Sequence, residues 1–191
     1  FNLGNHYRSG RGVEKNYAEA VRLYEKAIEL GHTKAITNLG LCYQNGGYGI
    51  EADPVKAAYL FRSRAEAGDS EGQYYLANLY RDGVGVEQNY EEAVRFYRLA
   101  AEQGDKYAMN NLGERYRNGE GTSQDIQQAI RCYEAAAEKG LGVACTNLGV
   151  IYETGECVSA DLPKALEWYR KGAKLGNKDC QIALKRLETG S

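Results

Sequence analysis

Apolar and small residues recur along this chain with helical spacing, and the same pattern returns about every 36 residues. In most copies an alanine, a leucine and a tyrosine occupy positions i, i+4 and i+8, which share one face of an α-helix. The repeated leucines, separated by 36, 37, 36 and 36 residues, are Leu3, Leu39, Leu76, Leu112 and Leu148. This pattern predicts the first helix of a unit that occurs five times.

A second block follows each of these helices in the same register. It places an alanine four residues before an aromatic residue: Tyr24, Phe61, Tyr97, Tyr133 and Tyr169. An Asn or Asp precedes it, the residue types that cap helix N-termini: Asn16, Asp53, Asn89, Asp125 and Asp161. A glycine ends each block, as expected for the left-handed residue after a helix: Gly31, Gly68, Gly104, Gly140 and Gly176. The block therefore predicts a second helix.

A small residue directly follows each repeated leucine: Gly4, Gly40, Ala77, Gly113 and Gly149. A glycine inside a helix costs about 1 kcal/mol relative to alanine. We therefore expect the backbone of another helix to cross closely at these positions.

The combined motif resembles the Sel-1-like repeat family, a relative of the tetratricopeptide repeat. It reads Ala-x-x-Asn-Leu-Gly-x-x-Tyr-x-x-Gly-x-Gly-Val, then Tyr-x-x-Ala-x-x-x-Tyr-x-x-Ala-Ala-x-x-Gly. The resemblance implies an all-α fold, a right-handed α-solenoid of about five antiparallel helix–turn–helix repeats of 36–37 residues with a C-terminal capping helix. It also implies that the protein functions as an adaptor or scaffold.

We expect one array over residues 1–191, and we interpret it as a fragment of a longer protein. The expected repeats are 1–31, 32–68, 69–104, 105–140 and 141–176, with a cap at 177–191. One extra residue near Gly46–Gly47–Tyr48–Gly49 predicts a bulged loop in repeat 2, and Cys157 replaces a glycine found in other repeats.

The composition and the charge argue against several classes of function. Charged residues make up 26 % of the chain, but the formal net charge is only −2, which argues against a nucleic-acid binder. No apolar run approaches the length of a membrane span, so no membrane insertion is expected within this chain. Five cysteines without CxxC spacing favour reduced thiols and a cytoplasmic location. A signal peptide upstream of Phe1 remains an open alternative.

Motifs for catalysis, metals or cofactors are missing from the sequence. The Gly-x-Gly turns follow predicted helices and lack the lysine–hydroxyl ending of a phosphate loop. Neither Ser-x-x-Lys nor HExxH occurs. We therefore predict no enzyme activity, no catalytic residue, no metal and no cofactor.

The resemblance to tetratricopeptide repeats implies a concave groove lined by three sets of residues on the first helices, here called the groove positions. The first set is Thr37, Tyr74, Asn110 and Thr146. The second set is Asn5, Leu41, Asn78, Glu114 and Val150. The third set is Arg8, Gln44, Arg81, Arg117 and Glu153.

Three of the five residues in the third set are arginines, which bind carboxylates bidentately. They predict a partner peptide with acidic character or a C-terminal carboxylate. The alternative is that these arginines pair with neighbouring glutamates or face solvent.

The leading hypothesis is an interaction scaffold that binds a protein partner in this groove. The first alternative is a regulatory or substrate-recruiting module of a larger enzyme. The second is a secreted, host-directed or β-lactam-interacting repeat protein. The sequence leaves the oligomeric state open.

Overall fold

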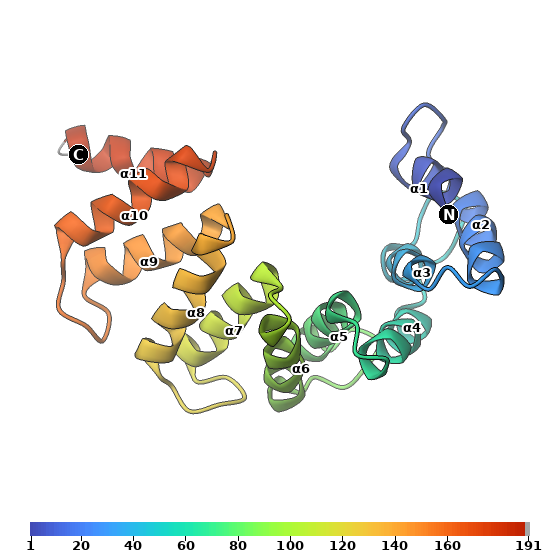
Figure 1. Ribbon diagram of the computed structural model, residues 1–191, viewed down its shortest axis with the longest axis horizontal. Coiled ribbons are helices and arrows are strands. Elements are labelled where there is room, and N and C mark those ends of the chain that lie inside the picture. Colours follow the sequence, from blue (N-terminus) through green and yellow to red (C-terminus); the bar gives the residue numbers. More distant parts are fainter. Residues whose placement is uncertain (190–191) are drawn as a thin grey trace. The chain divides into compact units, whose positions relative to one another are not determined.

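The computed structural model describes residues 1–189, which contain eleven α-helices and no β-strand (Figure 1). They form two compact units, and the first extends from Phe1 to Leu99. Its helices are α1 (Asn2–Ser9), α2 (Tyr17–Glu29), α3 (Lys34–Asn45), α4 (Pro54–Glu66), α5 (Ser70–Asp82) and most of α6 (Tyr90–Glu102). Consecutive helices from α1 to α5 pack on one another.

The second unit begins at Ala100. Its helices are α7 (Lys106–Asn118), α8 (Ile126–Glu138), α9 (Gly142–Thr154), α10 (Leu162–Lys174) and α11 (Lys178–Thr189). Each packs on the next, and α11 also contacts α9. The all-α prediction and the alternation of first and second helices are therefore confirmed.

Side-chain caps start every second helix, as predicted. The side-chain oxygen of the capping residue accepts a hydrogen bond from the backbone N–H three residues later, at 2.9–3.0 Å. The caps are Asn16, Asp53, Asn89, Asp125 and Asp161. The glycines that close the units have φ between +79° and +91°, the left-handed region expected of them.

Aromatic rings from the second helices fill the interior. Tyr24, Phe61 and Tyr97 in the first unit, and Tyr133 and Tyr169 in the second, are at most 1 % exposed. A Cβ at Gly4, Gly40 or Gly113 would lie 2.6–2.8 Å from the ring of the same repeat. The expected close approach therefore exists, but the nearest group is an aromatic ring and not a helix backbone.

The two departures from the repeat have local structural effects. In repeat 2, Gly47 and Ile50 pair through their backbones, and the Tyr48 carbonyl accepts the Tyr17 N–H at 2.7 Å, so the predicted bulge is present. In repeat 5, Cys157 is exposed and has φ +55°, a left-handed conformation that disfavours side chains. None of the helices in residues 1–189 is long and apolar enough to cross a membrane.

Candidate functional site

Most of the predicted groove positions are partly exposed, but two are not. Asn5, Arg8, Gln44, Tyr74 and Asn78 in the first unit are half-buried. So are Arg81 in that unit and Glu114 and Arg117 in the second.

Thr37 and Asn110 were predicted to contact a ligand in the groove, but both side chains are buried. Thr37 is 0 % exposed and Asn110 is 7 % exposed. Asn110 accepts a hydrogen bond from Asn147 at 3.0 Å, which joins α7 to α9. Thr37 is too short to reach solvent from a fully buried position. Both residues therefore contribute to packing.

Polar side chains at the groove positions also hold the first unit together. The Tyr24 hydroxyl donates to the Asn5 side chain at 2.8 Å, and Asn38 donates to the same oxygen at 2.7 Å. Tyr97 and Asn78 repeat this tyrosine-to-asparagine bond at 2.6 Å. Repeat 2 has Phe61 at the tyrosine position and Leu41 at the asparagine position, so it lacks both the hydroxyl donor and the amide acceptor of this hydrogen bond.

Arg8 lies beside this polar cluster. Burial raises the pKa of Tyr24 to about 12, although the positive charge of Arg8 acts in the opposite direction. The Arg8 Nε is buried and makes no hydrogen bond. No carboxylate within residues 1–189 forms an ion pair with Arg8.

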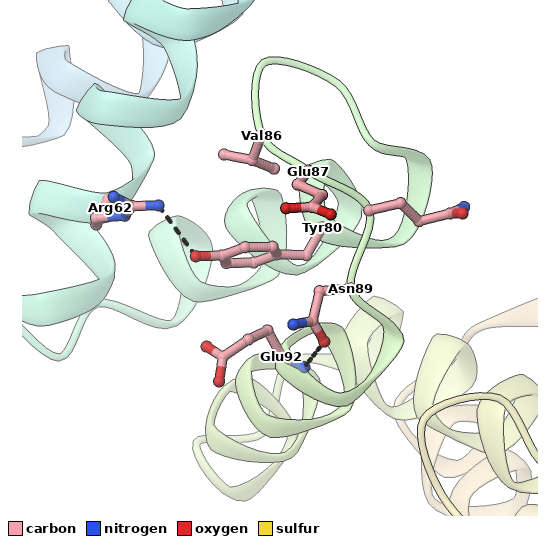
Figure 2. Close-up of a pocket in the computed structure, with 7 residues that line it drawn as sticks. Arg62, Tyr80, Val86, Glu87, Asn89 and Glu92 are labelled. Carbon is pink, nitrogen blue, oxygen red and sulfur yellow. Dashed lines mark hydrogen bonds between the residues drawn. The ribbon is translucent and has the colours of Figure 1, made fainter.

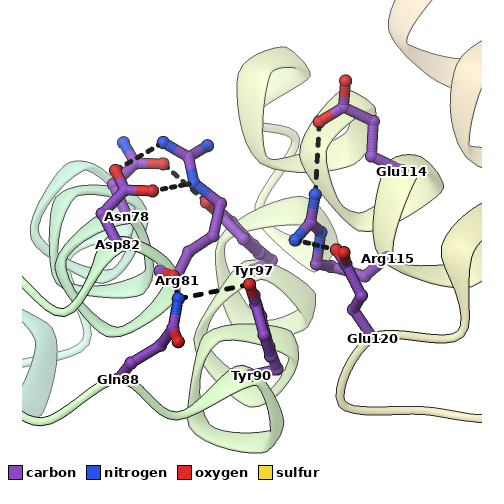
Figure 3. A network of polar contacts seen from close by, with 9 residues as sticks. All are labelled: Asn78, Arg81, Asp82, Gln88, Tyr90, Tyr97, Glu114, Arg115 and Glu120. Carbon is purple, nitrogen blue, oxygen red and sulfur yellow. Dashed lines mark hydrogen bonds and ion pairs between the residues drawn. The ribbon is translucent and has the colours of Figure 1, made fainter.

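Arg81, by contrast, contacts a carboxylate of its own helix. Its guanidinium donates two hydrogen bonds to Asp82, both at 2.7 Å (Figure 3). Gln88 donates to the Arg81 carbonyl at 2.8 Å and to the Tyr90 hydroxyl at 3.2 Å. Arg81 therefore has a binding partner without any ligand.

In the second unit, Arg117 is held by a bidentate contact with Glu156, which lies on the turn of the next repeat. The hydrogen bond from Arg117 lowers the pKa of Glu156. On the same helix, Arg115 pairs with Glu120 and lies 3.6 Å from Glu114 (Figure 3). For Arg117, the alternative of pairing with a neighbouring glutamate is what the structure shows.

The groove positions of repeat 5 meet the last helix around a cavity of about 350 Å³. It is lined by Thr146, Val150, Glu153, Thr154, Tyr169, Asp179, Ile182, Ala183 and Arg186. Burial acts to raise the pKa of Glu153, but hydrogen bonds from Tyr169 and Arg186 outweigh it, and the pKa is lowered. Ile182 is 66 % exposed, so the cavity offers an apolar wall to a ligand.

A second cavity, of about 470 Å³, lies in the first unit and was not predicted from the sequence (Figure 2). We call it the Tyr80 cavity. Its lining residues are Arg62, Tyr80, Val86, Glu87, Gln88, Asn89 and Glu92. Glu92 stands where repeats 2 and 5 have Lys56 and Lys164, but this signal does not predict the cavity, because repeats 1 and 4 also lack the lysine.

The described residues contain no group of three His, Cys, Asp or Glu side chains suited to a metal ion. All five cysteines are free thiols, and Cys42, Cys145 and Cys180 are buried. Burial raises the pKa of Cys42 to about 11, so this thiol is a poor nucleophile.

Repeated helix pairs with side-chain caps, ring-against-glycine packing and polar ties between neighbouring repeats define a helical repeat protein. The sequence family that matches is the Sel1 repeat, over residues 1–32, 33–69, 70–105, 106–141 and 142–177. The chain therefore belongs to the Sel1 repeat family, as the sequence motif predicted. Proteins of this family generally mediate protein–protein interactions and are typically non-catalytic.

Two solved structures illustrate the relationship. A Sel1 repeat protein from Oxalobacter formigenes is 37 % identical, with a TM-score of 0.84, over 97 % of this chain and 73 % of that one. The protein c5321 is a protective antigen of uropathogenic Escherichia coli strains that displays the same type of fold. It is 33 % identical, with a TM-score of 0.52, over 97 % of this chain and 47 % of that one.

One curated relative is Chitin synthase regulatory factor 2 of Schizosaccharomyces pombe. It is 35 % identical over 77 residues, which are 39 % of this chain. The matched part spans 15 % of the length of that protein.

Proposed function

We propose that this chain is a scaffold that binds an extended or helical segment of a partner protein on the face formed by its first helices. Binding, and not catalysis, is the proposed activity. The observation that carries this proposal is the state of Arg8, which has no carboxylate partner in the described chain although Arg81 and Arg117 each have one.

The chemistry around Arg8 favours a carboxylate ligand. The Arg8 side chain is half-buried and forms no ion pair within residues 1–189, so an incoming carboxylate would neutralise its charge through charge-assisted hydrogen bonds. Asn5 and Gln44 are half-buried groove positions of the same unit and add polar contacts. The proposed ligand is therefore an acidic side chain or a C-terminal carboxylate of a partner peptide.

Within the second unit, the cavity at repeat 5 supplies a different contact. Val150, Ala183 and the exposed Ile182 suit an apolar side chain, and Glu153 and Arg186 neutralise each other at 2.6 Å. Peptide segments commonly combine an apolar anchor with polar contacts.

A peptide-display selection tests the proposal. Libraries with free and with blocked C-termini are selected against the intact chain, and enriched peptides are synthesised. Their dissociation constants are measured for the natural chain and for Arg8→Gln. The control is Arg131→Gln, which removes an exposed arginine from α8, a second helix.

We expect carboxylate-bearing peptides to be enriched. Loss of a bidentate ion pair should weaken binding to Arg8→Gln about tenfold or more, equivalent to about 1.4 kcal/mol, and leave Arg131→Gln unchanged. Equal affinities for all three proteins would show that Arg8 is not part of the binding site.

The similarity to Chitin synthase regulatory factor 2 supports a second candidate, in which this chain is the partner-recruiting part of a larger regulatory protein. The scaffold and the recruiting module are distinguished by comparing the full-length gene product with this chain in the same peptide-binding assay. Identical peptide preferences with additional domains in the gene product would favour the recruiting module.

A further inference from the structure

The Tyr80 cavity occupies a place that two other repeats fill with a lysine of their own. In repeat 2, the Lys56 ammonium donates to the Tyr43 hydroxyl at 2.7 Å and lies 4.0 Å from the ring centroid. In repeat 5, the Lys164 ammonium lies 4.1 Å from the Tyr152 ring centroid. Each lysine is the third residue after the helix cap, and each tyrosine is four residues after the repeated leucine.

Repeat 3 keeps the tyrosine but lacks the lysine, as do repeats 1 and 4, which have Glu19 and Gln128 at the lysine position. The cavity beside the tyrosine is what sets repeat 3 apart. The residue of repeat 3 at the lysine position is Glu92, which pairs with Arg95 at 2.8 Å.

Arg62 of α4 donates to the Tyr80 hydroxyl at 3.0 Å, and the cavity remains beside the ring (Figure 2). The Tyr80 hydroxyl therefore already accepts from a cationic group, and the part of the interaction left open in repeat 3 is the contact between an ammonium group and the tyrosine ring.

The lining charges suit a cation in this place. Glu87 is exposed and forms no ion pair within residues 1–189, so its carboxylate is available to a ligand. Glu92 also lines the cavity, but Arg95 donates hydrogen bonds to both of its carboxylate oxygens, at 2.8–3.2 Å, so Glu87 is the carboxylate left for a ligand. A tyrosine face attracts an ammonium group by about 0.5–2 kcal/mol, depending on how far the site excludes water.

We propose that the Tyr80 cavity binds the ammonium group of a lysine side chain of a partner protein, in the place that Lys56 and Lys164 take in their own repeats. Arg62 of α4 donates to the tyrosine hydroxyl, and the unpaired carboxylate of Glu87 offsets its charge. None of the groove positions lines this cavity, so the site is separate from the carboxylate-binding face proposed above.

A nuclear magnetic resonance titration of the whole chain tests this site. The probe is Nα-acetyl-lysine N-methylamide, followed by ¹H–¹⁵N spectra at millimolar concentrations. The norleucine analogue is the matched neutral probe, and the glutamate analogue is the matched anion. The lysine probe should shift the amides of Tyr80 and of residues 86–92, and the other two probes should not.

Glu92→Lys supplies the test by mutation, because it gives repeat 3 the lysine that repeats 2 and 5 already have. This variant should reduce the lysine-induced shifts at least about tenfold, because its own ammonium fills the place. The matched control is Glu91→Lys, which makes the same charge change at an exposed residue outside the cavity and should preserve the shifts. Unchanged spectra elsewhere show that both variants remain folded.

Three results would overturn the proposal: equal shifts with norleucine, preferential shifts with the glutamate probe, or no lysine-induced shifts at these residues. Loss of the shifts in both variants would overturn it as well, because bulk charge would then explain the effect. Carboxylate peptides that depend on Arg8 would still bind in each case, so the proposed function is tested separately.

Discussion

The glycine after the repeated leucine is fixed by the aromatic ring that lies against it. At Gly113 a Cβ would lie 2.8 Å from Cε1 of Tyr133, a ring that is fully buried. Such a contact requires either the ring or the helix to shift. Repeat 3 has Ala77 at this position and keeps Tyr97 fully buried, so its backbone accommodates the methyl group.

Gly113→Ala should therefore destabilise the chain by about 1–3 kcal/mol through overpacking, although alanine favours helices more than glycine does. Urea unfolding followed by circular dichroism measures the change. Ala77→Gly is the reciprocal control and should cost about 1 kcal/mol from lost helix propensity. A Gly113→Ala variant as stable as the natural chain would contradict the ring-contact explanation.

Cys157 carries a side chain in a backbone conformation that the corresponding positions of other repeats give to glycine. Its φ is +55°, whereas Gly12, Gly85 and Gly121 have φ between +70° and +75°. Cys157→Gly should stabilise the chain by about 0.5–1 kcal/mol, because glycine has no Cβ to clash in this region. Thermal unfolding under reducing conditions checks this, and a lower midpoint would show that the cysteine makes a compensating contact.

At the scale of elements, side chains link the first helix of one repeat to the first helix of the next repeat and to the turn that follows it. Arg117 of α7 reaches Glu156 after α9, and Asn147 of α9 reaches Asn110 of α7. The helices and caps could be predicted because local spacing and capping chemistry determine them. Pairing of the arginines with glutamates was one of the alternatives, but the partner of each link could not be predicted, because the linked residues lie 37 and 39 positions apart and local spacing does not determine which side chains meet.

Glu156→Gln should cost roughly 0.5–1 kcal/mol near neutral pH, since the pair is partly exposed. Arg117 lowers the pKa of Glu156 in the folded chain, so the pair adds stability above the unfolded glutamate pKa of about 4.3. That contribution is lost as the pH falls through the lowered folded value. Urea unfolding should show a difference from the natural chain that is constant from about pH 7 to 5 and shrinks in acid. A difference independent of pH would indicate a packing effect.

At the scale of the whole molecule, the family and the order of the helices could be predicted from one sequence because the motif is repeated. Five copies in one register allowed each position to be compared with four others, which identified the leucine, the ring and the cap. Exposure was harder to predict, because Thr37 and Asn110 share a register with half-buried Tyr74. The Tyr80 cavity could not be predicted, because repeats 1 and 4 also lack the lysine of repeats 2 and 5 and only side-chain packing distinguishes repeat 3.

The central claim is that a partner segment binds to the first helices of the repeats. It is tested most directly by ¹H–¹⁵N shift mapping of the intact chain with a peptide obtained from the display selection. We expect the largest shifts at Asn5, Arg8 and Gln44 in α1 and α3, and we expect Arg8→Gln to need about tenfold more peptide to reach the same shifts. Shifts confined to the second helices, and unaffected by Arg8→Gln, would contradict the claim.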